Sequence, residues 1–311
     1  MNNKIRVAVL MGGKSPEYDV SITSGNEVVK QLDKNKYNVI PFKVPKSGRG
    51  VESILKTKPD VVYIAMHGPF GEDGTLQGML DILGIKYTGP GVLASAIGMD
   101  KVMFRKVMAA ENISIPKYII YKDGGSIPNI FSKLGKPPYF VKPFDQGSSV
   151  GASVVKDKKD FEKSLRFALK YSQIALVDEF VDGLELTCAV LGNENPIPLP
   201  IIEIKALKGN FFDYKSKYSD NGAQEIVPAR ISSELTKKVQ DIAVKVYKAV
   251  GCRGVSRVDF ILKDNRLPVV LEINTSPGLT PTSLLPKAAK VAGMSYSQLL
   301  DRIIGYATEK N

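Results

Sequence analysis

The sequence predicts a mixed α/β and α+β chain, in which an open parallel α/β sheet precedes smaller α+β units. Its 311 residues exceed one typical domain of roughly 150 residues, so two or three domains are expected. The first third alternates apolar runs with segments of helical spacing, which is typical of an open α/β sheet. After Pro116 short apolar runs follow one another with few helices between them, which indicates antiparallel hairpins.

The N-terminal sheet is predicted to begin at residues 5–11. This apolar run ends at Gly12 and Gly13, as a buried parallel strand does when it enters a tight turn. Ligands of open α/β sheets bind outside the carboxyl ends of the strands, which are expected here at 12–15 and 67–68. The other expected elements are strands at 37–44, 61–66 and 86–88, and helices at 20–32, 51–56 and 74–83.

The rest of the chain predicts mainly strands. The expected strands are 139–142, 151–155, 174–177, 185–191, 200–204, 254–262 and 269–274, and the regions of helical spacing are 94–112, 161–171 and 232–250. The polar stretch 205–228 has the length at which a loop is usually functional. After Pro281 we expect a turn and then a helix to the end.

Composition and charge exclude several classes of protein. Hydrophobic residues make up 43% and charged residues 24%, which excludes disorder of the whole chain. The net charge is +11, but basic and acidic residues alternate along the chain, so we expect no nucleic-acid interface. Cys188 and Cys252 allow no disulfide framework and are expected in the core. Without a signal peptide or an apolar run of about 18 residues, we expect a cytoplasmic protein that does not enter membranes.

Three glycine-containing segments could bind phosphate. The first, at 13–15, resembles the end of a Walker A loop, but Ala8 stands where that loop requires glycine. The second, at 89–94, fits a loose dinucleotide pattern with Glu111 as the ribose acid, although a connection between domains explains it better. In the third, Lys142 precedes a glycine-rich loop that could fold over phosphates, the alternative being a β-turn with an exposed lysine.

Charged residues at alternate positions near the end of the chain predict a metal site. Arg257 and Asp259 share one face of an expected strand, and Glu272 and Asn274 share one face of the next. Carboxylate and amide oxygens suit Mg²⁺, and an arginine beside them could neutralise a transferring phosphoryl group. The alternative is an edge of the sheet that faces water.

Because His67 is the only histidine, a zinc site is excluded and only one residue could serve as a histidine base in nucleophilic catalysis. Without paired cysteines, a tetrahedral site of nitrogen and sulfur ligands cannot be assembled. A serine-type triad would have to use His67 as its base. Its place at the carboxyl end of a parallel strand leaves a structural role and a functional role equally open.

These features together resemble the ATP-grasp superfamily and, within it, the D-alanine–D-alanine ligase family. The similar segments follow in family order: GGKSPEYDVS at 12–21, HGPFGEDGTLQG at 67–78, YTGPG at 87–91, MDK at 99–101, KPFDQGSSVG at 142–151, DYKSKY at 213–218 and LEINTSPGLT at 271–280. The sequence departs from the family pattern at Tyr18, where a basic residue is usual, and at the pair Asp145 and Gln146.

The resemblance implies a three-domain ligase with a nucleotide site between two α+β domains. The implied domains are 1–98, 99–190 and 191–311, with a lid loop at 205–228. ATP would phosphorylate the carboxylate of one D-alanine, and the amine of a second would attack the acyl phosphate to form D-alanyl-D-alanine for peptidoglycan. Two Mg²⁺ or Mn²⁺ ions and a homodimer are also implied.

The resemblance also implies which residues form the site, by matching the positions of the family's motifs to this sequence. The nucleotide would be bound by Lys101, Lys142, Ser148, Asp178 or Glu179, Phe180, Val181, Glu185, Phe211 and Lys217. The metal ions would be held by Asp259, Glu272 and Asn274. The first D-alanine would bind Glu17 and His67, and the carboxylate of the second would bind Ser283 and Leu284. Catalysis would involve Glu17, Ser148 and Tyr218 as a hydrogen-bonded set, with Arg257 and Gly278 at the tetrahedral intermediate.

Two related activities remain as alternatives. A ligase that joins D-alanine to D-lactate would share most of these residues, although Tyr218 favours an amino-acid acceptor. Another ATP-grasp carboxylate–amine ligase would share the nucleotide site but not Glu17 or Ser283. A basic nucleic-acid-binding protein is the alternative from another class, and it would turn over no ATP.

Overall fold

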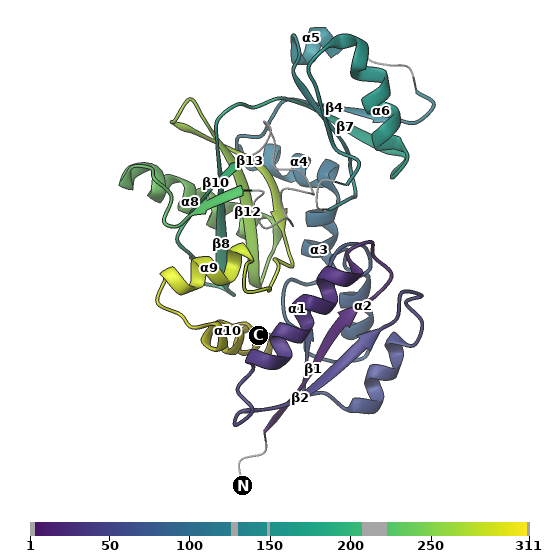
Figure 1. Ribbon diagram of the computed structural model, residues 1–311, viewed down its shortest axis with the longest axis vertical. Helices are drawn as coiled ribbons and strands as arrows, with labels where there is room; N and C mark the ends of the chain where they lie inside the picture. Colours follow the sequence, from purple (N-terminus) through teal and green to yellow (C-terminus); the bar gives the residue numbers. More distant parts are fainter. Residues whose placement is uncertain (1–3, 126–129, 148–149, 207–222, 310–311) are drawn as a thin grey trace.

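The computed structural model describes residues 4–125, 130–147, 150–206 and 223–309. Within these ranges the strands form three sheets, which follow one another along the chain (Figure 1). The N-terminal sheet is parallel, whereas the pairings in the other two are antiparallel. The predicted combination of an α/β unit with α+β units is therefore confirmed.

The N-terminal sheet has the strand order β2-β1-β3. Its central strand has six consecutive buried residues, which explains the continuous apolar sequence. The expected strand at 86–88 is reduced to one parallel bridge between Val62 and Tyr87. The elements are β1 (Ile5–Gly12), α1 (Tyr18–Gln31), β2 (Tyr37–Val44), the 3₁₀ helix η1 (Val51–Thr57), β3 (Val61–Ile64) and α2 (Thr75–Ile82).

Two helices, α3 (Val92–Met99) and α4 (Lys101–Ala110), replace the single helical region expected at 94–112. Asp100 separates them with an extended backbone. Its carboxylate accepts hydrogen bonds from the backbone N–H groups of Val102 and Met103, both at 2.9 Å. An N-cap of this kind begins a new helix without disturbing the apolar spacing, so periodicity did not reveal the break.

The central sheet has the order β4-β7-β5-β6. The helices α5 (Ile130–Leu134) and α6 (Phe161–Leu169) belong to this unit, and Leu165 of α6 packs in one core with Val141 and Val177. The strands are β4 (Tyr118–Lys122), β5 (Tyr139–Pro143), β6 (Ser153–Val155) and β7 (Ile174–Glu179). The pairing of β5 with β6 confirms the hairpin predicted around the glycine-rich loop.

The largest sheet has the order β11-β10-β8-β12-β13, and β9 pairs with β8. The long amphipathic helix α8 (Ser233–Val250) packs on one face, between an N-cap at Ser232 and a left-handed Gly251. The strands are β8 (Leu184–Gly192), β9 (Ile197–Pro198), β10 (Ile202–Ala206), β11 (Ala223–Ile226), β12 (Gly254–Lys263) and β13 (Leu267–Asn274). Of the expected loop at 205–228, residues 205–206 are the end of β10 and 223–226 form β11, whereas 207–222 lie outside the described residues.

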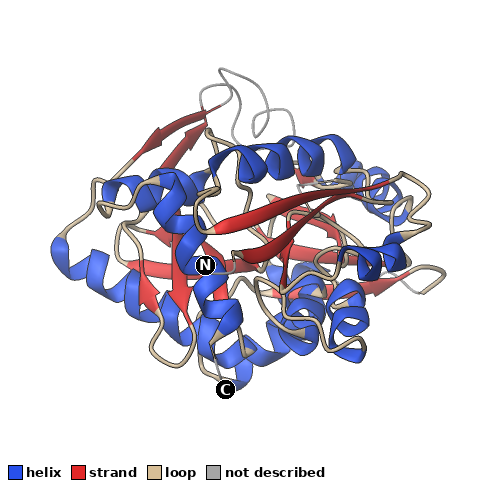
Figure 2. Ribbon diagram, turned by 90° about the horizontal axis from the view of Figure 1, so that it is seen from below, coloured by secondary structure: helices blue, strands red, loops and turns tan. Residues whose placement is uncertain are grey.

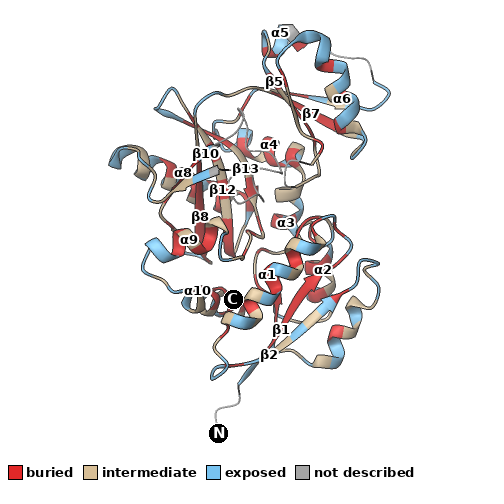
Figure 3. Cartoon of the chain, in the orientation of Figure 1, coloured by how far each residue is buried: buried red, intermediate tan, exposed pale blue. Residues whose placement is uncertain are grey.

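The chain ends in two helices rather than one, α9 (Leu284–Val291) and α10 (Tyr296–Thr308). A capping box between Ser295 and Gln298 begins the second helix. The apolar spacing alone does not reveal this new helix start. Helix α10 lies against the N-terminal sheet, where Leu299 and Ile303 share a core with Val9 (Figures 1 and 3). The C-terminal segment thus joins the first domain to the largest sheet, and Figure 2 shows helices on both sides of the strands.

The structure suggests different domain boundaries from those implied by the resemblance. A boundary between residues 190 and 191 would cut β8, which pairs with both β10 and β12. A boundary after residue 98 would cut α3, which packs against α8 and β13. We propose boundaries at about Gly91 and Gly183, where the chain passes between sheets. No helix in the described part of the chain is long and apolar enough to cross a membrane.

Candidate active site

The carboxyl edge of the N-terminal sheet brings Glu17 and His67 together. Glu17 follows β1, His67 follows β3, and both side chains are buried. Gly68 packs directly on this pair of segments: a Cβ atom there would lie 2.3 Å from Ser15 Oγ and 2.7 Å from Glu17 Oε2. Its φ of +73° also favours glycine. The predicted substrate residues of the first domain therefore form one buried polar cluster.

His67 is held by hydrogen bonds at both ring nitrogens. Its Nδ1 lies 3.1 Å from Glu72 Oε1, and its Nε2 lies 3.1 Å from Ser24 Oγ. Burial lowers the pKa of His67, but the hydrogen bond and charge of Glu72, with the charge of Glu17, raise it above its ordinary value. The two carboxylates thus shift the pKa of the imidazole in the direction that favours protonation.

The connectivity Ser24–His67–Glu72 is that of a hydrolase triad, but its position excludes that role. Ser24 lies on α1 and is fully buried, so no substrate carbonyl can approach its hydroxyl. This serine instead orients the imidazole. The structure therefore shows a structural role for His67, which links Ser24 to Glu72. A functional role, in which its charge attracts a substrate carboxylate, stays a prediction.

The glycine-rich loop between β5 and β6 lies over this cluster. A Cβ atom at Gly147 would lie 3.3 Å from Glu17 Oε2. Lys101, at the start of α4, donates from Nζ to the carbonyl of Gln146 at 2.6 Å, and its Nζ is 3.9 Å from Glu272 Oε2. The buried Lys101 ammonium thus joins the loop to the acidic strands of the largest sheet.

A buried charge network that the sequence did not indicate holds the second lysine. Lys142 Nζ lies 3.1 Å from Asp178 Oδ2, and Arg105 on α4 donates to the same oxygen at 3.0 Å. Arg105 is fully buried and also donates to the carbonyl of Val270 at 3.2 Å. The available signal was the spacing of four residues between Lys101 and Arg105, which places both cations on one face of α4.

Asp178 and Glu179 differ in what they contact. The Asp178 carboxylate is buried in ion pairs, whereas Glu179 Oε1 accepts from the backbone N–H of Lys117 at 2.9 Å. The backbone N–H of Phe180 donates to the Pro138 carbonyl at 3.2 Å. Val181 follows in the connection to β8, and Glu185 is the second residue of that strand; both are half-buried. The segment 178–185 therefore runs between the central and the largest sheet.

The predicted metal residues meet on one face of β12 and β13. Asp259 is the register partner of Glu272, and Arg257 is the partner of Asn274. Arg257 donates to both Asp259 oxygens, at 2.9 and 2.8 Å, and Thr187 of β8 donates to Oδ1 at 2.5 Å. Strand alternation therefore places these side chains together, as expected, and adds Thr187.

The donor set fits a hard divalent cation. Two carboxylates and an amide oxygen are ligands that Mg²⁺ or Mn²⁺ accepts, with phosphate and water oxygens completing the coordination. Among the described residues no group of three His, Cys, Asp or Glu side chains could hold a metal ion. In the structure Arg257 neutralises Asp259, so this guanidinium would have to release the carboxylate for a cation.

Gly278 and Ser283 are brought together beyond β13. A Cβ atom at Gly278 would lie 2.9 Å from Ser283 Oγ, and this hydroxyl accepts from the backbone N–H of Thr280 at 3.0 Å. Ser283 is the N-cap residue of α9, and Leu284 is the first residue of the helix. The first N–H groups of a helix have no carbonyl partner within it and favour anions.

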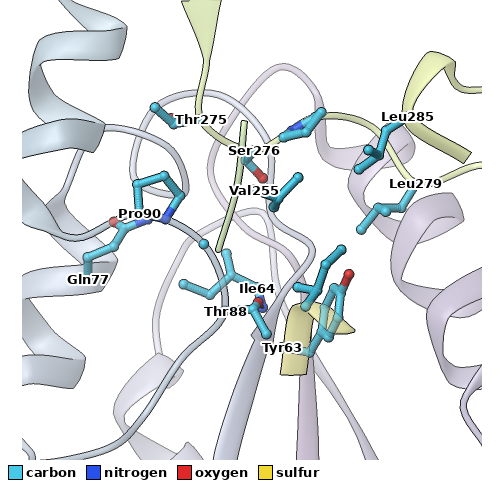
Figure 4. A pocket seen from close by; sticks show the side chains of 13 residues that line it. Tyr63, Ile64, Gln77, Thr88, Pro90, Val255, Thr275, Ser276, Leu279 and Leu285 are labelled. Carbon is cyan, nitrogen blue, oxygen red and sulfur yellow. Dashed lines mark hydrogen bonds between the residues drawn. The ribbon is translucent and has the colours of Figure 1, made fainter. Parts of the chain in front are cut away.

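The turn after β13 also meets the N-terminal sheet. A cavity of about 20 Å³ lies at this junction, between Tyr63 and Ile64 on one side and Thr275 and Ser276 on the other (Figure 4). Ser276 Oγ is 3.5 Å from the Met66 carbonyl, next to His67. The two ends of the predicted substrate site are therefore in direct contact. Four predicted residues lie outside the described ranges: Ser148, Phe211, Lys217 and Tyr218.

Comparison with known proteins identifies the relatives of this chain. Residues 93–305 match the family described as D-ala D-ala ligase C-terminus, and residues 6–54 and 48–90 match D-ala D-ala ligase N-terminus. The D-alanine–D-alanine ligase of Desulforudis audaxviator is 42% identical over 98% of this chain and 99% of its own length.

Solved structures show the same similarity. The D-alanine–D-alanine ligase of Bacillus anthracis has a TM-score of 0.85 at 38% identity and covers 97% of both chains. The VanG D-Ala:D-Ser ligase of Enterococcus faecalis has a TM-score of 0.87 at 34% identity, over 98% of this chain and 100% of its own. With family matches to both halves and full-length relatives at this identity, the chain belongs to the D-alanine–D-alanine ligase family.

Proposed function

We propose that this protein joins two D-alanine molecules in an ATP-dependent reaction that passes through D-alanyl phosphate and supplies peptidoglycan precursors. The observation that carries this proposal is the convergence of three segments from different domains: Glu17 with His67, the glycine-rich loop, and the acidic strands that end near Ser283. A relative from Bacillus anthracis has been solved as a complex with ATP, at 37% identity.

The chain's own residues account for each step. Glu17 binds the ammonium of the first D-alanine, and His67 attracts the substrate carboxylate through its charge, so that one carboxylate oxygen is oriented toward the γ-phosphate of ATP. Lys101 and Lys142 neutralise the phosphates, and ADP leaves as the carboxylate oxygen bonds to phosphorus. The first turn of α9 at Ser283 and Leu284 binds the carboxylate of the second D-alanine. Its amine attacks the acyl carbon, and phosphate departs.

Asp259, Glu272 and Asn274 would hold the divalent cations that screen the charge of the phosphates. Arg257 and the backbone near Gly278 stabilise the tetrahedral intermediate. The nucleotide base lies along residues 178–181, with Glu185 at the ribose. Ser148 and Tyr218 complete a set with Glu17, and Phe211 and Lys217 contact the nucleotide from the segment at 205–228, which we propose as a lid.

We also propose a cytoplasmic homodimer. The two cysteines are free thiols, as expected in a reducing compartment. Ile82 of α2 and Val92 and Leu93 of α3 are 88%, 41% and 69% exposed, and these apolar side chains of two contacting helices could be covered by a second copy. Light scattering of Leu93→Glu tests this: the mass should fall to that of a monomer, and an unchanged mass would place the interface elsewhere.

A coupled assay for ADP release tests the reaction. We expect turnover with D-alanine and Mg²⁺ or Mn²⁺, and little turnover with L-alanine or without a divalent cation. Mixtures of D-alanine with D-lactate or D-serine test the acceptor, the latter because one similar structure is a D-Ala:D-Ser ligase. Loss of activity in Glu272→Ala supports the metal assignment, whereas full activity contradicts it.

A further inference from the structure

A second, larger pocket lies in the N-terminal domain, beside the turn at 67–73. Its volume is about 340 Å³, which is within the range of about 300–1,000 Å³ typical of small-molecule sites. We name it the Met66 pocket, after the methionine in its wall. Apolar side chains form most of the wall and two cations stand at the rim, the main residues being Val44, Met66, Leu76, Met79, Lys14 and Arg49.

The rim carries positive charge that none of the described carboxylates neutralises. Lys14 and Arg49 are exposed, and neither forms an ion pair with a carboxylate in the described part of the chain. None of the described residues that line the pocket is acidic. A negatively charged group at the rim would therefore be attracted by two cations at once, whereas a cationic group would be repelled.

An aromatic side chain stands at the same rim in an unusual conformation. Phe70 is 44% exposed, and its φ of +70° lies in the left-handed region, which is unfavourable for a bulky residue. Its backbone N–H donates to Asp73 Oδ2 at 2.8 Å, and Lys14 Nζ is 5.2 Å from the ring centroid. Strain of this kind persists only where the surroundings enforce it, and it concentrates at ligand-binding sites.

The pocket and the first-substrate site share the same short segment. Met66 lines the pocket and His67 belongs to the substrate cluster; Phe70 lines the pocket and Glu72 holds His67. The main chain of Met66 is closely packed within this segment, since a Cβ atom at Gly71 would lie 2.7 Å from Met66 Cβ and 3.0 Å from the Met66 carbonyl carbon. A ligand that displaces Met66 or Phe70 therefore acts on the same segment that positions His67 and Glu72.

We propose that the Met66 pocket binds a small molecule with an aromatic body and one anionic head group, and that its occupancy changes the affinity of the first-substrate site. Two methionines and Phe70 favour an aromatic body, because sulfur and ring edges contact aromatic rings well. Lys14 and Arg49 bind the head group. The binding is independent of the proposed function, whereas the coupling rests on it.

Three probes with one body and different charges test the binding. Isothermal titration calorimetry on the ligand-free protein would compare 4-phenylbutyrate, 4-phenylbutan-1-ol and 4-phenylbutylamine. We expect the carboxylate to bind at least about tenfold more tightly than the alcohol, and the amine to bind weakest. Equal binding of the three probes, or no binding of any, would overturn the site.

Charge reversal at the rim provides the matched variant. The double substitution Lys14→Glu with Arg49→Glu should lower the affinity for 4-phenylbutyrate by about tenfold or more and raise the affinity for 4-phenylbutylamine. The control is Lys122→Glu with Lys163→Glu, an equal change of charge on exposed residues of the central domain. If the control weakens the carboxylate as much as the rim variant does, the attraction comes from net charge, and the proposal is wrong.

The coupling is read from kinetics after binding is established. At saturating 4-phenylbutyrate the KM for D-alanine should change by about fivefold or more, and the rim variant should abolish that change. Tight, rim-dependent binding with an unchanged KM would overturn the coupling. A protein that binds the probe but releases no ADP with D-alanine would contradict the proposed function and leave the binding result intact.

Discussion

The Oε2 atom of Glu17 would lie 3.3 Å from a Cβ atom placed at Gly147, although the two residues belong to different domains. The glycine-rich loop of the central domain therefore rests on the carboxylate that follows the first strand. Lys101 fixes the same loop through the Gln146 carbonyl. The position of the loop thus depends on both the N-terminal domain and α4, and a small change at Gly147 acts directly on the Glu17 carboxylate, which we assign to the ammonium of the first D-alanine.

The substitution Gly147→Ala should lower kcat with little loss of stability. The added methyl group meets Glu17, and a displacement of about 1 Å at a reacting site can cost about a hundredfold in rate. Gly305→Ala is the matched control. The residue lies inside α10, and a Cβ atom placed there would meet no atom within 4 Å outside its own helix turn. The control should retain full activity, and a fully active Gly147→Ala enzyme would show that the loop moves away from Glu17 during turnover.

The substitution Glu17→Gln should impair the use of D-alanine without unfolding the protein. Loss of a charge-assisted hydrogen bond costs about 1.5–3 kcal/mol, or about ten- to a hundredfold in rate. The measurement is D-alanine-dependent ADP release, with circular dichroism to verify folding. Glu52→Gln, on the exposed side of η1, should change neither quantity. Equal turnover of D- and L-alanine by the unmodified enzyme would show that the ammonium is not fixed where we place it.

The buried network around Asp178 should be costly to break from one side. In Arg105→Met the Asp178 carboxylate loses one of its two cations, and we expect a loss of about 3–5 kcal/mol in the free energy of unfolding. Adding Asp178→Asn should recover part of this loss, because the uncompensated charge is removed. Chemical denaturation measures both. The same substitution in an exposed pair, Arg166→Met, should cost close to nothing.

The pKa of His67 can be measured directly, because the chain has only this histidine. Despite burial, the hydrogen bond and charge of Glu72 hold this pKa above its ordinary value of 6.5. Because the pKa of His67 is higher in the folded state than in the unfolded state, protonated His67 stabilises the folded protein. This contribution to the free energy of unfolding is present in full below pH 6.5 and is lost as the pH rises through the folded pKa. NMR titration of the imidazole should show the raised value.

The variant Glu72→Gln separates the causes of this shift. Its imidazole pKa should fall, and its deficit in unfolding free energy should be largest below pH 6.5 and shrink at alkaline pH. Ser24→Ala removes a neutral partner and should shift the pKa less. An unperturbed pKa in the unmodified protein would contradict the charged state that we assign to His67.

Local patterns determined much of this protein. Continuous apolar runs predicted the parallel strands β1 and β3, and alternation predicted that Asp259 and Glu272 would share a face. Both follow from the fixed geometry of a strand, in which side chains alternate over two residues. The series of short motifs also placed the chain in its family, because residue types in order along the chain need no coordinates to be compared.

Only the tertiary structure decided which distant segments meet. The sequence did not indicate that Arg105 would pair with Asp178 or that α10 would return to the N-terminal sheet. It also missed the helix break at Asp100, where a side-chain cap replaces a backbone partner. Periodicity reports which face of an element is apolar, but not which other element covers it. That choice depends on packing and charge pairing between residues far apart in the chain, which local patterns do not contain.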